Sequence, residues 1–242
     1  MWNWYREFDS LWPPHFKMNT EDLKKVEELV KPTYLKIKIW THGWMHVQNV
    51  VEAARRIAEM EGVDPLPCQL AAYCHDLGRL EEEDRGLVKY KAGSPSAHAV
   101  LSVKPTEKIL DALDLDQKTK NHIIEAVKLH NIRKYEGDNK ILSILQDADR
   151  ADGFNKFSIL RFAHFNLEMK CDQPKNDLEI EEKFKWVVSE IAKDQILKDK
   201  MVHTLEYVMP WYDELMNTPS AKIILKDGYE FIKSYRDELK GK

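Results

Sequence analysis

The sequence predicts an all-α protein that forms a single compact multi-helix bundle of 242 residues. Apolar residues recur at intervals of three and four along most of the chain, whereas the strict alternation typical of β-strands is absent. No linker, internal repeat or low-complexity segment divides the sequence, and 43% hydrophobic residues suffice for a sizeable core. We therefore expect one all-α domain over residues 1–242.

The N-terminal third is expected to contain an arm and two helices. Residues 1–18 are rich in aromatic side chains, and we expect this arm to cover the domain or to pack against a second subunit, as in a homodimer. A helix begins at Thr20, a typical capping residue, and is expected to end near Pro32. The next helix runs from about 44 to 61 and stops at Gly62.

The segment from Cys68 to Arg79 leaves no polar face and predicts a short buried helix that carries His75 and Asp76. An isolated carboxylate in such a helix costs several kcal/mol, so Asp76 must be paired, protonated or bound to a cation. Adjacent side chains leave a helix only about 100° apart. His75 and Asp76 can therefore reach the same ion.

The middle of the chain is expected to form a long loop and two further helices. The charged stretch 81–96 predicts a loop, which could serve as a lid or simply as a solvated connection. A helix follows over about 97–113, with Pro105 as a kink or break. Asp116 caps the next helix, which brings His130 to its end on the apolar side.

The last part of the chain is expected to be a structural extension of the bundle. A helix containing the motif D-A-D-R-A-D places Asp149 on its apolar side. Beyond Gly153, the sequence predicts helices over residues 154–169, 177–192 and 196–216, and a final helix that begins at Thr218-Pro219.

Charge and cysteine content limit the classes of function and the compartment. The chain carries 37 Lys and Arg against 41 Asp and Glu, a net charge of −4, which argues against a dedicated nucleic-acid-binding protein. The three cysteines are an odd number and indicate reduced thiols. No apolar stretch approaches the roughly 20 residues of a membrane span. We therefore expect a cytoplasmic protein that acts without a membrane.

Six histidine and aspartate residues lie in five helical regions, and most of them sit on or beside an apolar stripe: His46, His75, Asp76, His98, His130 and Asp149. A single buried histidine is most often a satisfied core residue, but six such residues would each need a separate partner. A shared metal centre would satisfy them together, and mixed His and Asp ligands favour Mn, Fe, Zn, Co or Ni over Ca²⁺, with Mg²⁺ as a further candidate. Because His98 opens one helix and His130 ends another, we expect both at the mouth of this site.

The chain carries three motifs in order: H-V at His46, H-D-L-G at His75 and D-A-D-R-A-D at residues 147–152. This ordered set resembles the HD superfamily of metal-dependent phosphohydrolases. The resemblance covers about residues 40–155 and implies an HD-domain-like bundle followed by a C-terminal helical extension over 156–242. It also implies that His46, His75, Asp76 and Asp149 bind a metal ion. His98 and His130 fall where members with a second metal place extra histidines.

This resemblance implies hydrolysis of a phosphate monoester or diester, in a nucleotide or another small phosphorylated metabolite, by hydroxide that one or two metal ions activate. Asp76 is then central to catalysis. Arg79, one helical turn away, is expected either to hold the substrate phosphate or to form a surface salt bridge with Glu82 or Glu83. Further candidates for phosphate binding are Lys89, Lys91 and Arg133.

Arg79 also marks a departure from part of the family. HD nucleotidases and hydrolases of the stringent-response alarmone carry a Glu shortly after the His-Asp pair, where this chain has Arg79. This difference argues against those two specificities.

Two other functions fit the same residues. Some HD-fold enzymes are di-iron oxygenases, and four histidines with two aspartates resemble their ligands as well. A non-catalytic nucleotide-binding sensor is the other alternative, although retention of every metal ligand argues against it. Oxygen consumption with bound iron would favour an oxygenase, and anaerobic phosphate release would favour a hydrolase.

Overall fold

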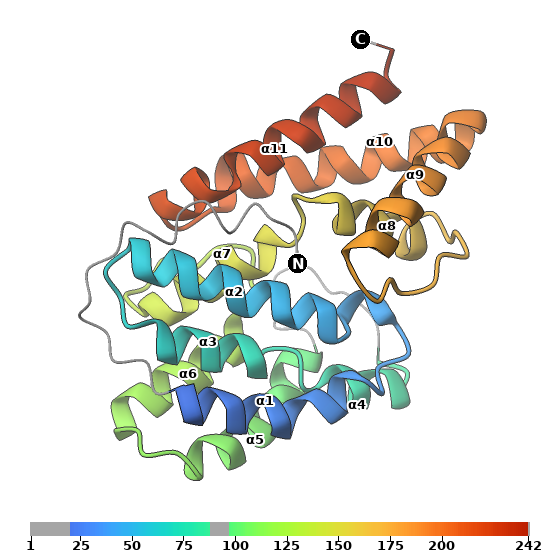
Figure 1. Ribbon diagram of the computed structural model, residues 1–242. Coiled ribbons are helices and arrows are strands. Elements are labelled where there is room, and N and C mark those ends of the chain that lie inside the picture. Colours follow the sequence, from blue (N-terminus) through green and yellow to red (C-terminus); the bar gives the residue numbers. More distant parts are fainter. Residues whose placement is uncertain (1–19, 88–96, 242) are drawn as a thin grey trace.

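The computed structural model describes residues 20–87 and 97–241, and within these ranges it contains helices and no strand (Figure 1). The predicted all-α class is therefore confirmed. The aromatic arm at residues 1–18 lies outside the described residues. None of the helices in the described ranges has the length and apolar character to cross a membrane.

The centre of the bundle is formed by three helices: α2 (Trp44–Met60), α3 (Pro65–Cys74) and α7 (Lys140–Ala151). Helix α3 begins at Pro65 behind the capping carboxylate of Asp64, which accepts a hydrogen bond from the Leu66 backbone N–H. It contacts α1, α2, α5, α6 and α7, which explains why it has no polar face.

Four helices surround this centre: α1 (Thr20–Tyr34), α4 (Arg79–Asp84), α5 (Ala97–Asp111) and α6 (Gln117–Leu129). Helix α1 packs on α3, α4 on α5, and α6 on α3, α5 and α7. As predicted, Asp116 caps α6, because its carboxylate accepts the Thr119 N–H.

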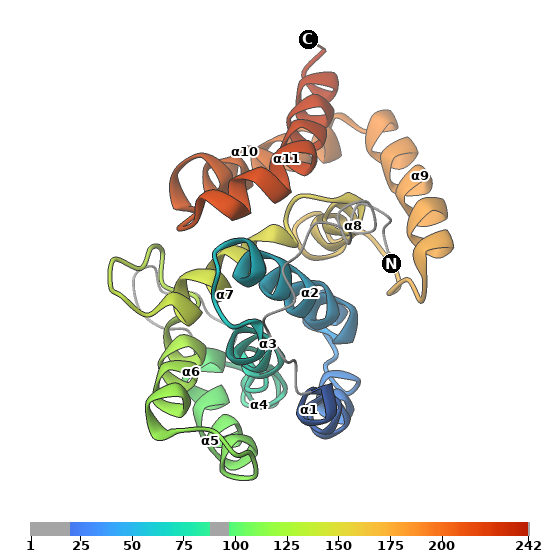
Figure 2. The same cartoon turned by 60° about the vertical axis from the view of Figure 1, so that its left-hand side comes forward.

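The remaining helices lie on the other side of α2 and α7 (Figures 1 and 2): α8 (Lys156–Phe165), α9 (Asp177–Lys193), α10 (Gln195–Pro210), the π-helical turn Trp211–Leu215 and α11 (Pro219–Leu239). Helix α11 packs on both α2 and α7. Asp147 of α7 fixes its start by accepting hydrogen bonds from the backbone N–H and the hydroxyl of Thr218, each at 2.8 Å. Thr218 in turn caps α11, as predicted.

Two prolines lie inside helices: α1 ends two residues after Pro32, close to the predicted end, and α5 is not broken at Pro105. Helix α1 continues through Pro32 to Tyr34, and α5 continues through Pro105 to Asp111. Each proline removes one backbone hydrogen bond. In α1 the loss falls in the last turn, and in α5 the adjacent Thr106 hydroxyl donates to the backbone carbonyl of Ser102 at 2.7 Å.

The predicted helix at residues 68–79 and the loop at 81–96 also differ in the structure. Helix α3 ends at Cys74, so His75 and Asp76 lie in the turn that follows. The next residues form α4, which extends to Asp84 instead of beginning a loop. The Glu83 carboxylate fixes α4 to the rest of the fold, because it accepts the backbone N–H groups of Lys38 and Ile39.

Candidate metal centre

The first His/Asp group consists of His46 on α2, His75 after α3 and Asp149 on α7. The two Nε2 atoms of the histidines lie 3.3 Å apart. The Asp149 Oδ1 atom lies 3.4 Å from Nε2 of His46 and 4.0 Å from Nε2 of His75. Three elements thus direct one donor atom each at a common point.

The second His/Asp group consists of Asp76, His98 at the start of α5 and His130 after α6. Here the two histidine Nε2 atoms are again 3.3 Å apart. The Asp76 Oδ1 atom lies 3.2 Å from Nε2 of His98 and 3.7 Å from Nε2 of His130.

Asp76 joins the two groups. Its other oxygen, Oδ2, lies 3.6 Å from Nε2 of His75 and 3.9 Å from Nε2 of His46 in the first His/Asp group. One buried carboxylate therefore presents one oxygen to each group, so Asp76 would be shared by ions held in the two groups.

Backbone carbonyl groups orient one histidine in each group. Nδ1 of His75 donates to the carbonyl of Ala72 at 2.7 Å, and Nδ1 of His130 donates to the carbonyl of Val127 at 2.8 Å. Both histidines directly follow a helix, where carbonyl groups lack an intrahelical partner. Because a carbonyl only accepts, the proton resides on Nδ1 and leaves Nε2 as an acceptor.

A carboxylate orients the other histidine of the first His/Asp group. The Oδ2 atom of Asp152 accepts from Nδ1 of His46 at 2.8 Å and also from the guanidinium of Arg161 on α8. Its Oδ1 atom accepts from the amides of Asn49 at 2.7 Å and Asn155 at 3.3 Å. Four donors thus hold this buried carboxylate in one orientation.

The second His/Asp group has a similar carboxylate and arginine. Oε1 of Glu82 lies 3.4 Å from Nδ1 of His98 and accepts the His98 backbone N–H at 3.1 Å. Arg79 donates through Nη1 to Glu82 at 3.0 Å and through Nε to Asp76 at 3.2 Å. This arginine therefore contacts both the orienting carboxylate and the bridging one.

Burial and charge determine the protonation of the cluster. Burial lowers the pKa of His75, His98 and His130, the last to about 4, so these rings are neutral near pH 7. Burial raises the pKa of both Asp76 and Asp149, but the neighbouring cationic and imidazole groups outweigh it and hold both values well below the usual range. The centre therefore combines neutral imidazoles with ionised carboxylates.

His46 differs from the other histidines. Burial and the charge of Arg161 lower its pKa, but hydrogen bonds to Asp149 and Asp152 outweigh both, so its pKa is raised. The raised pKa favours a proton on the His46 ring, and a cation that binds its Nε2 atom would compete with that proton.

The arrangement of donor atoms fits a divalent cation. Acceptor Nε2 atoms that face each other at 3.3 Å, together with two carboxylates, repel one another unless protons or cations lie between them. The described residues contain two groups that could hold an ion, and both belong to this cluster. Nitrogen and oxygen donors of this kind suit first-row transition metals.

The open side of the cluster differs from the predicted one. His98 and His130 were expected at the mouth of the site, but both are buried. Asp149 is the most accessible of the six residues, although only 32% of its side chain is exposed. Helix α5 packs on α4 and α6, and α6 packs on α3 and α7 as well, so both histidines belong to elements that have neighbours on several sides.

The predicted phosphate-binding residues lie in different environments. Arg79 is buried between Asp76 and Glu82, so the expected salt bridge with Glu82 exists but is not at the surface. Arg133 has 77% of its side chain exposed and lies 3.7 Å from the Glu214 carboxylate. The two lysines of the predicted loop, Lys89 and Lys91, lie outside the described residues.

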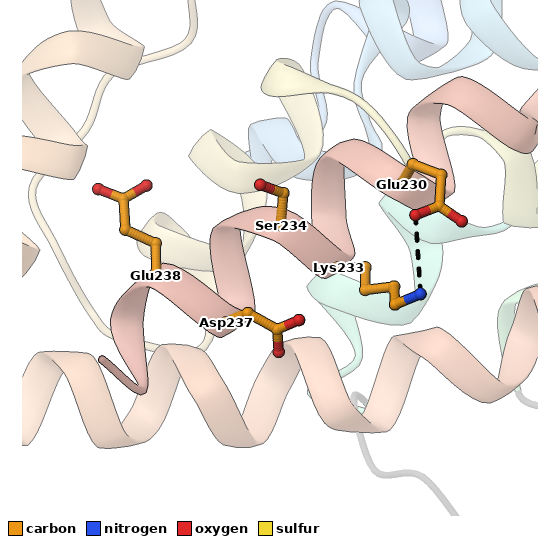
Figure 3. A pocket seen from close by; sticks show the side chains of 5 residues that line it. All are labelled: Glu230, Lys233, Ser234, Asp237 and Glu238. Carbon is orange, nitrogen blue, oxygen red and sulfur yellow. Dashed lines mark ion pairs between the residues drawn. The ribbon is translucent and has the colours of Figure 1, made fainter. Parts of the chain in front are cut away.

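Sequence reasoning missed the residues that orient the cluster. Asp152 stands in the same D-A-D-R-A-D motif as Asp149, and Glu82 was expected as a possible partner of Arg79 in a surface salt bridge. Arg161 has no signal in the sequence, because its role depends on how α8 packs near α2. The pocket in Figure 3 is separate: Glu230, Lys233, Ser234, Asp237 and Glu238, all from α11, line it, and none belongs to the cluster.

Comparison with known proteins finds one matching family model and several solved structures with a similar fold. Residues 43–154 match the HD domain family model. No curated protein sequence matches this chain.

Several solved structures share the fold at low sequence identity. Bacillus subtilis YpgQ in complex with ADP is 17% identical and aligns over 92% of this chain and 95% of its own, with a TM-score of 0.57. A protein from Lactobacillus plantarum is 17% identical over 93% of this chain and 97% of its own, with a TM-score of 0.55. A predicted HD superfamily hydrolase from an uncultured Thermotogales bacterium is 22% identical over 73% of this chain and 97% of its own, with a TM-score of 0.50.

The matched region contains all six residues of the two His/Asp groups, from His46 to Asp149. Helices α8 to α11 follow it in the sequence. Residues 43–154 of this chain thus match the HD domain family, and a helical extension follows them.

Proposed function

We propose that this protein is a metal-dependent phosphohydrolase that cleaves a phosphate ester of a nucleotide or another small phosphorylated metabolite. The observation that carries the proposal is the pair of His/Asp groups joined by the Asp76 carboxylate inside an HD domain. The HD superfamily supports a metal-dependent hydrolase, and the donor set supports one or two ions of Mn, Fe, Zn, Co or Ni, with Mg²⁺ as a weaker candidate.

The chain's own residues supply the binding and the orientation. The six donor side chains would hold the ions, and the partners of the four Nδ1 atoms keep each imidazole turned toward the centre. Bound divalent ions in such a centre lower the pKa of water and polarise a phosphoryl oxygen. The exposed edge at Asp149 is where a substrate would approach.

Positive charge next to this centre supports a phosphorylated substrate. Arg79 contacts Asp76 directly, and a guanidinium in this position could also donate to a phosphate oxygen. Arg133 follows His130 closely in the chain and extends into solvent. With Lys89 and Lys91 it completes the set of basic residues that we propose for substrate binding.

A nucleotide is the first substrate class to test. The proposal of a nucleotide takes support from the fold shared with YpgQ, which binds ADP. The experiment is an anaerobic screen of phosphate or pyrophosphate release from nucleotides and sugar phosphates, with the metal content of the same preparation measured. Turnover that depends on the metal and disappears with a chelator supports the proposal, whereas binding of nucleotides without any turnover would indicate a sensor.

A di-iron oxygenase is the second candidate. The bridging position of Asp76 between four histidines favours it, because such a centre suits two adjacent iron ions as well as two hydrolytic ions. Two equivalents of iron together with substrate-dependent oxygen consumption would favour the oxygenase over the hydrolase.

A further inference from the structure

The Asp152 carboxylate lies next to the candidate metal centre and accepts four hydrogen bonds. It is 2% exposed and accepts hydrogen bonds from His46, Asn49, Asn155 and Arg161. Asp152 is not one of the six side chains whose donor atoms face the centre. Its carboxylate therefore acts on the centre only through Nδ1 of His46.

Arg161 reaches this carboxylate from outside the HD domain. It lies on α8, seven residues beyond the end of the matched region at residue 154. The capping box at the start of α8 fixes this helix locally, because the Asn155 side chain accepts the Ser158 N–H at 2.8 Å while Asn155 also donates to Asp152. The start of the C-terminal extension is thus joined to the environment of His46 by two side chains.

We propose that Asp152 and Arg161 are positioning residues of the metal centre. Arg161 holds the Asp152 carboxylate, and this carboxylate fixes the ring of His46 with Nε2 directed at His75 and Asp149. The C-terminal extension is then a functional part of the centre, and the HD domain alone lacks one of the groups that orient its first ligand.

The inference rests on the proposed function, because it requires that the first His/Asp group binds a cation. Carboxylates that orient a ligating histidine contribute about 10- to 100-fold to metal affinity. Coulomb's law makes an opposite prediction for Arg161, since removal of a nearby positive charge should strengthen the binding of a cation. Weaker binding after loss of Arg161 would therefore separate positioning from simple charge.

The experiment is a titration of the metal-free full-length protein with Co²⁺ against a competing chelator, with the visible absorption of the bound Co²⁺ recorded. The variants are Asp152→Asn, Arg161→Met and Arg161→Lys. The matched control is Asp147→Asn, which makes the same change at another buried aspartate of the same motif that contacts Thr218 instead of the centre. Circular dichroism establishes that each variant is folded.

We expect Asp152→Asn to bind Co²⁺ about 10- to 100-fold more weakly with an altered absorption spectrum. Arg161→Met should also bind more weakly, and Arg161→Lys should recover most of the affinity because a single donor suffices for the contact. Asp147→Asn should bind like the unmodified protein. Arg161→Met provides the test even if Asp152→Asn does not fold.

Three results would overturn the inference. Unchanged or stronger Co²⁺ binding by Arg161→Met would show that Arg161 acts by charge or not at all. A loss of affinity in Asp147→Asn equal to that in Asp152→Asn would attribute the effect to general destabilisation. Failure of the unmodified protein to bind Co²⁺ would instead reject the proposed function, and the inference with it.

Discussion

The two His/Asp groups are built alike but are supported differently. In each group one histidine follows a helix and donates to a backbone carbonyl. The other histidine contacts a carboxylate that also accepts a hydrogen bond from an arginine. In the first group, four donors from two parts of the chain, α2 and α8 with its capping residue, hold the orienting carboxylate of Asp152. In the second group, the contact between Glu82 and His98 Nδ1 is long, at 3.4 Å, and the pair of Glu82 and Arg79 lies within the short helix α4.

This difference leads us to expect unequal affinities for the two ions. The first His/Asp group has a rigid outer environment, and Asp149 belongs to it alone. The second depends on Asp76, whose Oδ1 atom also receives the Arg79 guanidinium. A cation bound there would have to share this oxygen with a positive charge, so we expect the second group to bind its ion more weakly.

Asp76→Ala is expected to have the largest effect, because it removes the carboxylate that both groups share. The variant should lose metal and activity together. It should keep its helix content, because the Asp76 side chain contributes few apolar contacts to the packing of the helices. Elemental analysis, a phosphatase assay and circular dichroism measure these three quantities. Full activity in this variant would contradict the assignment of the site.

The double variant His98→Ala/His130→Ala tests the inequality directly. It should lose about one equivalent of metal and most activity, while His46, His75, Asp76 and Asp149 retain the other ion. The matched comparison is His46→Ala, which should reduce metal content at least as much because the tighter group is affected. A metal content of one per chain both before and after the double substitution would reject the second ion and, with it, the oxygenase.

Arg79→Ala should have an intermediate effect. If Arg79 holds the substrate phosphate, its loss removes a charge-assisted contact worth roughly 1.5–3 kcal/mol, or about 10- to 150-fold in kcat/KM. The ion of the first His/Asp group should remain. Unchanged kinetics would restrict Arg79 to pairing with Asp76 and Glu82.

Asp147→Asn should have the smallest effect on activity but a measurable effect on stability. The substitution weakens the hydrogen bonds that fix Thr218 and the start of α11, and we expect a loss of about 1–3 kcal/mol in the free energy of unfolding. Denaturant titration measures the loss. A metal affinity that falls in parallel would show that the loss of stability itself weakens the centre.

The fold and the six clustered residues were predictable because both follow from helical periodicity. Most of the six were placed by their position relative to an apolar stripe, and His98 by its place in the first turn of a helix. The structure brings all six together: His46, His75, Asp76, His98, His130 and Asp149. Helix ends were less predictable. The apolar run through Leu77 does not reveal that α3 ends at Cys74, because the turn that carries His75 and Asp76 is as buried as the helix.

The surroundings of the six residues could not be predicted from the sequence. Three aspartates of one short motif have three different partners: Asp147 binds the start of α11, Asp149 faces the centre, and Asp152 orients His46. Periodicity separates Asp147 from Asp149, but the partner of Asp152 depends on where α8 packs. Such contacts are set by tertiary structure and leave no local pattern.

Anomalous X-ray diffraction from crystals grown with Mn²⁺ tests the central claim most directly, because it locates each ion. We predict one peak among His46, His75 and Asp149 and a weaker peak among Asp76, His98 and His130, about 3.5–4 Å apart on either side of the Asp76 carboxylate. A single peak would contradict the two-ion centre. The absence of any peak at these residues, in crystals that contain Mn²⁺, would contradict the metal centre itself.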